Sequence, residues 1–160
     1  MFEMDEIYER MSEFATLQYN QRGTYVLVMQ CRRAVKVQIG QLSNMCMEIG
    51  WYLYIGSAFG SGGLKARVGR HLREQKKKHW HIDYLLPNIT VREIWYRCAN
   101  RKLEHHWADA ILSQPNSAIP VLGFGSSDCN CKTHLVYFRH RMNVEAARER
   151  LSPHIWLLSS

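Results

Sequence analysis

The chain has 160 residues, of which 46% are hydrophobic, and its formal net charge is +7. This length fits one domain with a sizeable core and short additions at its ends. The composition excludes a disordered chain, and no apolar run approaches the ~20 residues of a membrane span. A basic chain favours a polyanionic partner, with nucleic acid first and an anionic membrane surface second.

The N-terminus and the cysteines both indicate an intracellular protein. Residues 1–14 are acidic and lack the apolar core of a signal peptide. The five cysteines form an odd set in a chain with no export signal, which argues against a disulfide framework. We therefore expect reduced thiols and a cytoplasmic location.

In chain order, the first part of the sequence predicts a helix followed by strands. Ile7, Met11 and Phe14 recur at spacings of four and three, as on one face of a helix. Arg32 and Arg33 mark a turn between the first two strands. The predicted elements here are a helix over residues 4–17 and strands over 24–29, 34–39 and 51–55.

A glycine-rich loop over residues 57–63 leads into the next predicted helix. Leu64, Val68 and Leu72 follow at i, i+4 and i+8 and form the stripe that should be buried. The remaining predicted elements are a short helix at 79–86, a strand at 91–97, a helix at 103–112, a strand at 134–138 and a helix at 144–151.

This order of elements predicts an α+β fold with a small, mainly antiparallel sheet flanked by helices. Helices alternate with strands, and short turns join neighbouring strands. We assign the domain to residues 22–140. Residues 1–21 and 141–160 are expected to form helical extensions at the two ends.

Two tyrosine-bearing strands and the helix after the glycine loop carry the main chemical signal. Gly23-Thr24-Tyr25 begins one strand, and Tyr54-Ile55-Gly56 ends another. Either tripeptide alone is better explained by sheet packing. Arg67 and His71 are four residues apart on the following helix, so they share one face and should point together toward the mouth of the sheet.

These ordered motifs resemble the GIY-YIG nuclease superfamily. The first motif has Thr24 in place of isoleucine, the second is complete, and residues 64–68 are similar to the arginine helix of that superfamily. The resemblance covers roughly residues 22–140. Three further blocks are similar to a prokaryotic branch of the superfamily: Gly56-Ser57-Ala58, residues 79–86, and the Gly-Phe-Gly-Ser-Ser-Asp-Cys loop at 123–129.

The resemblance implies a nuclease-like fold and a single-metal phosphodiesterase. In the family, an arginine contacts the scissile phosphate, a tyrosine helps to activate water, and a helical glutamate binds Mg²⁺ or a similar cation such as Mn²⁺. Arg67 then contacts the phosphate, Tyr25 or Tyr54 belongs to the water-activating network, and His71 orients groups or relays a proton. A tyrosine has a pKa near ~10, so nearby cations must lower it before the hydroxyl becomes a useful base.

The metal-binding carboxylate is assigned to Glu104. Relatives in this branch tend to have two acids in the helix, where this chain has Glu104 and His106. If the second position were the ligand, His106 would weaken binding of a hard cation, because Mg²⁺ prefers oxygen ligands. The apolar stripe is centred near Trp107, so Glu104 is the residue expected to face inward. The alternative for Glu104 is an ordinary exposed acid.

A basic run follows the glycine loop. We assign it to contacts with the nucleic-acid backbone, since clustering beside a glycine loop favours phosphate binding over a merely solvated face. DNA is expected more than RNA, no membrane partner is expected, and the oligomeric state is left open. The assigned residues are Lys65, Arg70, Arg73, Lys76, Lys77 and Lys78.

Several other residues admit two interpretations. His79 and His81 would line a phosphate groove or simply pack. Asp128 would lie near the substrate or cap a turn. Cys129, Cys131 and His134 have the character of soft metal ligands, but zinc would need a fourth ligand and Cys-x-Cys is not the usual knuckle spacing.

The chain is therefore predicted to be a metal-dependent DNA endonuclease with little sequence specificity of its own. The alternative is a nucleic-acid-binding module of the same fold that has lost turnover, which the departures at Thr24 and His106 suggest. A weaker alternative is a thiol or zinc protein built around Cys129 and Cys131. The predicted catalytic residues are Tyr25, Tyr54, Arg67, His71 and Glu104.

Overall fold

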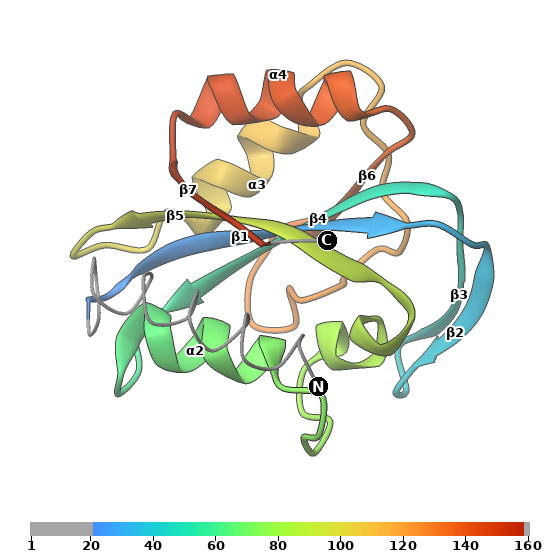
Figure 1. The fold of residues 1–160 in the computed structure, drawn as a ribbon, viewed down its shortest axis with the longest axis horizontal. Helices are drawn as coiled ribbons and strands as arrows, with labels where there is room; N and C mark the ends of the chain where they lie inside the picture. The colour runs from blue at the N-terminus through green and yellow to red at the C-terminus, as the bar shows by residue number, and fades with distance from the viewer. Residues whose placement is uncertain (1–20, 159–160) are drawn as a thin grey trace.

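The computed structural model describes residues 21–158, and the helix predicted over 4–17 lies outside them. A five-stranded sheet forms the centre of an α+β domain, and a two-stranded sheet lies at one end (Figure 1). The strand pairings are antiparallel in both sheets, which confirms the predicted fold class. The strands are β1 (Gly23–Cys31), β2 (Val35–Ile39), β3 (Ser43–Met47), β4 (Gly50–Ala58), β5 (Thr90–Cys98), β6 (Leu135–Phe138) and β7 (His154–Leu157).

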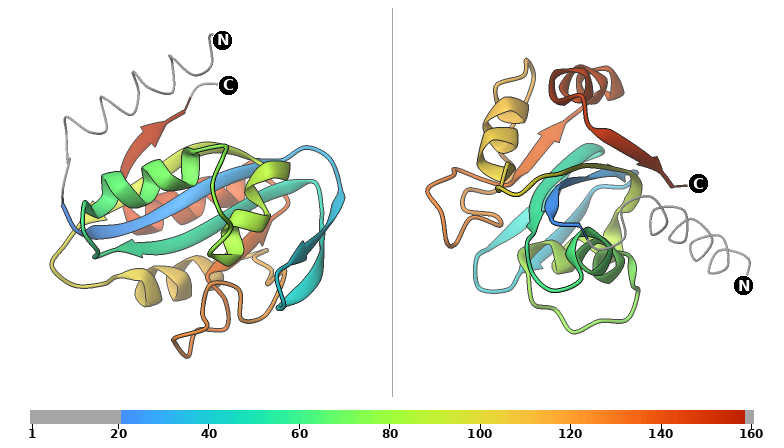
Figure 2. Two further views of the ribbon diagram at one scale, coloured as in Figure 1. Left: turned by 90° about the horizontal axis from the view of Figure 1, so that it is seen from below. Right: turned by 90° about the vertical axis from the view of Figure 1, so that its left-hand side faces the viewer.

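Helices cover both faces of the main sheet (Figures 1 and 2). One face carries α2 together with the short 3₁₀ turns η1 and η2, and the other face carries α3 and α4. The sheet therefore forms the middle of three layers. The helical elements are α2 (Gly63–Leu72), η1 (His81–Tyr84), η2 (Leu86–Asn88), α3 (Glu104–Leu112) and α4 (Arg141–Leu151).

The apolar run in β1 places this strand at the centre of the sheet, whose strand order is β6-β4-β1-β5-β7. Tyr25 and Leu27 belong to the core on the α2 side, whereas Val26 and Val28 belong to the core under α3 and α4. Successive side chains of a strand point to opposite faces, so a strand covered on both sides must be apolar at nearly every position.

The turn predicted at Arg32-Arg33 does not make β1 and β2 neighbours in the main sheet. β2 pairs instead with β3, which was not predicted, and Val35 lies opposite Met47. Lys36 and Gln38 of β2 are exposed, so this strand has one wet face. A strand with one solvent-exposed face fits the small outer sheet. Strand β1, which is covered by helices on both faces, pairs with β4 and β5.

The described part of the C-terminal segment is integral to the domain. We had assigned residues 141–160 to an extension, yet α4 buries Val144, Ala147 and Leu151 in the core on its face. The unpredicted strand β7 pairs with β5 at the edge of the sheet. The short helix expected at 79–86 is resolved into the two 3₁₀ turns, the second of which contains Pro87.

No helix among residues 21–158 has the length and apolar character needed to cross a membrane.

Candidate functional site

The register between β1 and β4 brings the two motif tyrosines together. Tyr25 lies opposite Gly56, and Tyr54 lies opposite Leu27, two positions along the same face. The tyrosine ring centroids are 6.5 Å apart. A Cβ atom on Gly56 would lie 2.4 Å from the Tyr25 hydroxyl oxygen, so the glycine of the second motif leaves the space that the tyrosine of the first motif fills.

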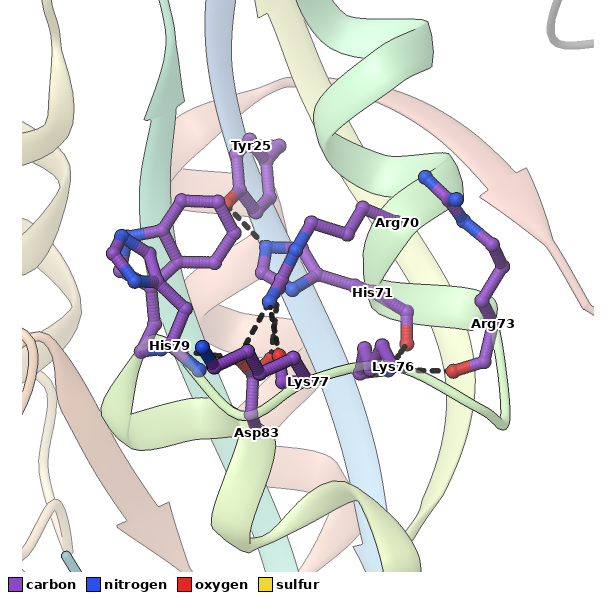
Figure 3. A network of polar contacts seen from close by, with 9 residues as sticks. Tyr25, Arg70, His71, Arg73, Lys76, Lys77, His79 and Asp83 are labelled. Atoms are coloured by element: carbon purple, nitrogen blue, oxygen red, sulfur yellow. Dashed lines mark hydrogen bonds and ion pairs between the residues drawn. The ribbon is translucent and has the colours of Figure 1, made fainter.

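Helix α2 brings His71 to these tyrosines. The glycine loop starts the helix with Gly62 and Gly63 at φ +81° and +58°, a conformation that favours glycine. His71 lies on the buried side of α2 and is 2% exposed. The Tyr25 hydroxyl is 2.7 Å from His71 Nε2, which makes a hydrogen-bonded pair inside the core (Figure 3). Arg67 also makes a side-chain hydrogen bond with Tyr25, so Arg67 and His71 both reach this tyrosine from one helix.

Arg67 is half-buried and lies over the ring of Trp80. Its guanidinium carbon is 4.4 Å from the ring centroid, which is a cation–π contact. The contact limits the positions that the side chain can adopt and keeps its charge near the tyrosines. Trp80 was not predicted to belong to the site, because nothing in the sequence shows that the chain after α2 folds back under Arg67.

Burial dominates the electrostatics of the tyrosines. It raises the pKa of both Tyr25 and Tyr54, and the nearby Arg67 charge opposes this shift without overcoming it. Both hydroxyls are therefore protonated at neutral pH, even though Arg67 lowers their pKa values as expected.

His71 is a neutral imidazole in this environment. Burial lowers its pKa to about 3. Its Nδ1 atom is buried and has no hydrogen-bond partner among the described residues. In the tautomer with the proton on Nδ1, Nε2 accepts the hydrogen bond from Tyr25, so the neutral imidazole fixes the direction of the tyrosine hydroxyl.

Glu104 approaches the tyrosines from the start of α3. The backbone N–H of Leu103 donates to Thr24 Oγ1 at 2.9 Å, which ties the start of the helix to β1 beside Tyr25. An isoleucine at position 24 has no atom that accepts this bond. The Glu104 side chain is 16% exposed, and its negative charge raises the pKa of Tyr25 and of Tyr54. The carboxylate therefore lies within electrostatic reach of both hydroxyls.

His106 faces a different region. It is exposed and lines a pocket of about 390 Å³ next to α3 and the end of α4. The pocket is basic, with Arg97, Arg101 and Arg150 among its lining residues. The geometry thus separates the two candidate ligands, because Glu104 is near the tyrosines and His106 borders this other pocket.

Arg70 and Lys76, both assigned to nucleic acid, make side-chain hydrogen bonds within the protein. Arg70 donates to both carboxylate oxygens of Asp83, at 3.0 and 2.9 Å, and to the backbone oxygen of Lys77 (Figure 3). Lys76 Nζ donates to the backbone oxygens of His71 and Arg73, which caps the C-terminal end of α2. Both cations hold the segment after α2 in place.

The other basic residues are more open. Arg73, Lys77 and Lys78 are exposed, and Lys65 is half-buried. Lys78 Nζ lies 4.9 Å from the centroid of the Tyr84 ring. These residues remain the candidates for contacts with a phosphate backbone.

Asp83 organises the turn that carries Trp80. Burial alone would raise the pKa of its carboxyl, but hydrogen bonds from Arg70 and from the backbone N–H groups of Trp80 and His79 lower that pKa to about 2. The N–H bonds are 3.0 and 2.8 Å long. The ionised carboxylate therefore joins α2 to the turn beneath Arg67.

The loop from Gly123 to His134 forms a wall of the site. His81 Nδ1 accepts a 2.9 Å hydrogen bond from the N–H of Gly125, which gives this histidine a positioning role. A Cβ atom on Gly125 would lie 3.1 Å from the Tyr54 ring and 3.2 Å from His134. His79 and Asp128 are both exposed, and the Asp128 charge contributes to the raised pKa of Tyr54.

A family comparison covers nearly the whole described domain. Residues 24–156 match the family described as "Domain of unknown function DUF123". The chain belongs to the DUF123 family. No curated protein and no solved structure was found to match it. The matched region reaches into β7, in agreement with the packing of α4 and β7 as parts of one domain.

Within this DUF123 domain, the residues that the sequence analysis missed are those whose partners are distant in the chain. Asp83 and Trp80 act through α2, and His105 lies beside Cys131, 26 positions away. For His105, the signal in the sequence was its place beside Glu104 in a predicted helix. Its closeness to the Cys-x-Cys loop is visible only in the folded structure.

Proposed function

We propose that this DUF123 protein is a metal-dependent endonuclease that hydrolyses phosphodiester bonds in DNA. The observation that carries the proposal is the convergence of three kinds of group on the two tyrosines. Arg67 supplies a fixed cation, Glu104 supplies a carboxylate, and His71 supplies a hydrogen-bond acceptor for Tyr25. The resemblance to the GIY-YIG motifs supports the same assignment.

Arg67 is the residue that contacts the scissile phosphate. Attack on a phosphodiester builds negative charge on the phosphate oxygens, and a positioned guanidinium stabilises that charge with two parallel hydrogen bonds. Stacking on Trp80 holds Arg67 in advance of binding, so less conformational entropy is lost when the phosphate arrives.

Tyr25 and His71 orient the attacking water. The Tyr25 oxygen accepts a hydrogen bond from the water, while its own hydroxyl donates to His71 Nε2, 2.7 Å away, which fixes the direction of its lone pairs. The water oxygen forms the new bond to phosphorus as the bond from phosphorus to the leaving oxygen breaks, and the proton lost by the water passes through solvent to the leaving oxygen. This arrangement needs no tyrosinate and no imidazolium, which agrees with the raised pKa of Tyr25 and the pKa of about 3 of His71.

Glu104 is the residue that would hold Mg²⁺ or Mn²⁺. Its carboxylate offers the oxygen ligands that such hard cations prefer, and they commonly take one or two carboxylates together with water and substrate phosphate. When bound, the cation would stabilise charge on the leaving oxygen as a Lewis acid. The shielded position of Glu104 near both hydroxyls fits this role.

The test compares Arg67→Ala with Arg73→Ala on duplex, single-stranded and branched DNA in Mg²⁺ or Mn²⁺. Both arginines belong to the same basic segment, but Arg73 is exposed and follows the last residue of α2. We expect Arg67→Ala to lose about 100-fold or more in cleavage rate, as on loss of a transition-state hydrogen-bond donor. Arg73→Ala should weaken binding modestly. Undiminished cleavage by Arg67→Ala would overturn the assignment.

One observation favours the binding module as the second candidate. Tyr25 is fully buried and His71 is 2% exposed, so this hydrogen-bonded pair lies inside the core. A domain that only binds DNA would show salt-sensitive affinity and no metal-dependent nicking on any of the three substrates.

A further inference from the structure

Four soft-ligand side chains meet beside the start of α3, outside the tyrosine site. His105, Cys129, Cys131 and His134 each offer one ligand atom, and these atoms all lie within 4.8 Å of one another. His105 Nδ1 is 2.9 Å from Cys131 Sγ, and His134 Nε2 is 3.5 Å from Cys129 Sγ. The cluster joins residues from the helix, the loop and the segment that leads into β6.

We propose that these four side chains bind one Zn²⁺ ion in a closed, structural site. Two thiolates and two imidazoles are a common ligand set for tetrahedral zinc. Around such an ion, neighbouring sulfur and nitrogen ligands lie about 3.3–3.8 Å apart. The four ligand atoms lie up to 4.8 Å apart, so small side-chain movements would bring them to these distances. Four protein ligands leave no open position for substrate, which makes the site structural.

Backbone hydrogen bonds hold the segments around the cluster in place. Gly123 N–H donates to Lys132 O, and His134 N–H donates to Phe124 O, both at 2.8 Å, which closes the loop at its base. Cys129 N–H donates to Ser126 O at 3.3 Å and turns the chain toward Cys131. His134 is 3% exposed, and its backbone oxygen accepts from the N–H of Ile55 in β4. Two of the ligands therefore lie in a closed loop and a third is fixed to the sheet.

The site also has a consequence for the proposed nuclease, and this part rests on the proposed function. His105 Nδ1 faces the cluster, and its other ring nitrogen, Nε2, is 3.6 Å from a Glu104 carboxylate oxygen. Histidines that bind zinc through one nitrogen usually direct the other toward a carboxylate or carbonyl, which fixes the ring. Zinc would thus anchor the first turn of α3 and with it the orientation of Glu104.

The test is metal analysis of the full chain purified from cells grown with added zinc. We expect about one zinc per chain, in line with four ligands around one position. Replacement by Co²⁺ should give the absorption bands of a tetrahedral ion bound by thiolates. Chelation should lower the melting temperature. Protein that carries no zinc and takes up no stoichiometric Co²⁺ would overturn the proposal.

Variants distinguish the residues that bind zinc from neighbouring residues of the same type that do not. Cys131→Ser should lose zinc, whereas Cys46→Ser, an exposed cysteine on β3, should keep it. If Cys131→Ser does not fold, His105→Ala serves, because His105 is on the surface and its loss leaves three ligands. We expect at least about tenfold weaker zinc binding, with the neighbouring exposed His106→Ala as the control. Equal zinc affinity in His105→Ala and the wild type would remove His105 from the site.

These measurements contain no DNA. The zinc proposal therefore stands or fails independently of the nuclease. A protein that binds zinc but cuts nothing would support the metal site and contradict only the proposed function.

Discussion

Because Gly56 has no Cβ atom, it leaves room for the tyrosine of the other motif. The Tyr25 ring occupies the space that a side chain at position 56 would need. The glycine therefore allows Tyr25 to reach His71, and the effect is steric, because the backbone of Gly56 is not among the positive-φ glycines. The two sequence motifs therefore form one packing arrangement across two neighbouring strands.

Gly56→Ala should displace Tyr25 and remove activity. We expect a cost of about 1–3 kcal/mol in the free energy of unfolding, as for other overpacked core positions. Chemical denaturation and the DNA cleavage assay measure the two effects. Gly60→Ala is the control, because a Cβ there meets nothing within 4 Å. Equal stability and activity in the two variants would contradict the packing described for Tyr25.

Tyr25→Phe tests the hydroxyl itself. The variant keeps the ring but leaves His71 Nε2 without its partner, so we expect cleavage to fall at least about 100-fold, in the range of general acid–base catalysis. Tyr52→Phe is the matched control, because Tyr52 is also buried and also makes a hydroxyl hydrogen bond, to Glu48. If the two variants lose similar activity, Tyr25 has no special chemical role.

At the level of elements, the Arg70–Asp83 ion pair holds the turn with Trp80 against α2. The Arg70 guanidinium also lies 4.1 Å from the centroid of the Trp80 ring. Arg67 uses the same ring, so the ion pair positions the arginine that we propose to contact phosphate. The run of cations after the glycine loop is therefore divided between residues that build the site and residues that remain exposed.

Asp83→Asn should destabilise the domain in a pH-dependent way. The folded pKa of about 2 is below the ordinary 3.8, so the carboxylate contributes stability above pH 4 and loses it as the pH falls toward 2. We expect a loss of about 2 kcal/mol at pH 7. The difference between wild type and variant should shrink between pH 4 and pH 2 in urea unfolding. The exposed Asp109→Asn should show no such difference.

The sequence alone predicted the elements whose signals are local. The α+β class, the strand β1, the buried stripe of α2 and the motif tyrosines follow from periodicity and short motifs. The strand β7 was missed because it has four residues and is stabilised by β5, which is distant in the chain. The strand β3 was missed, although it pairs with the neighbouring β2, because its residues 43–47 include no β-branched or aromatic side chain. The contacts of Arg70 and Lys76 were missed for a related reason, since a run of cations does not show which of them find acceptors.

For the whole molecule, the site lies at the junction of both layers of helices. Helix α2 provides Arg67 and His71 from one face, and Glu104 comes from α3 on the opposite face (Figure 1). The central sheet carries the tyrosines between them. The arrangement depends on the complete fold, so stability and activity should change together when the domain is perturbed.

Acid should destabilise the folded domain through His71. In the unfolded chain His71 takes up a proton below about pH 6.5, whereas the folded pKa is about 3. The unfolded state therefore binds more protons between these values, and stability falls as the pH drops from 6.5 toward 3. His71→Gln should reduce this slope by up to about 1.4 kcal/mol per pH unit.

Urea unfolding at pH 7, 6 and 5 measures that slope. The exposed His79→Gln is the control and should retain the slope of the wild type. A His71→Gln slope identical to that of the wild type would show that His71 is not buried as a neutral ring.

The most direct test of the account is the single-turnover cleavage rate of DNA in Mg²⁺ by Glu104→Gln and His106→Gln, measured beside the wild type. The two positions are two residues apart on α3 but face different regions. Glu104→Gln should bind DNA as the wild type does and cut it at least about 100-fold more slowly, because a neutral amide is a poor ligand for a hard cation. His106→Gln should cut normally. Wild-type cleavage by Glu104→Gln, or no cleavage by any of the three proteins, would contradict the account.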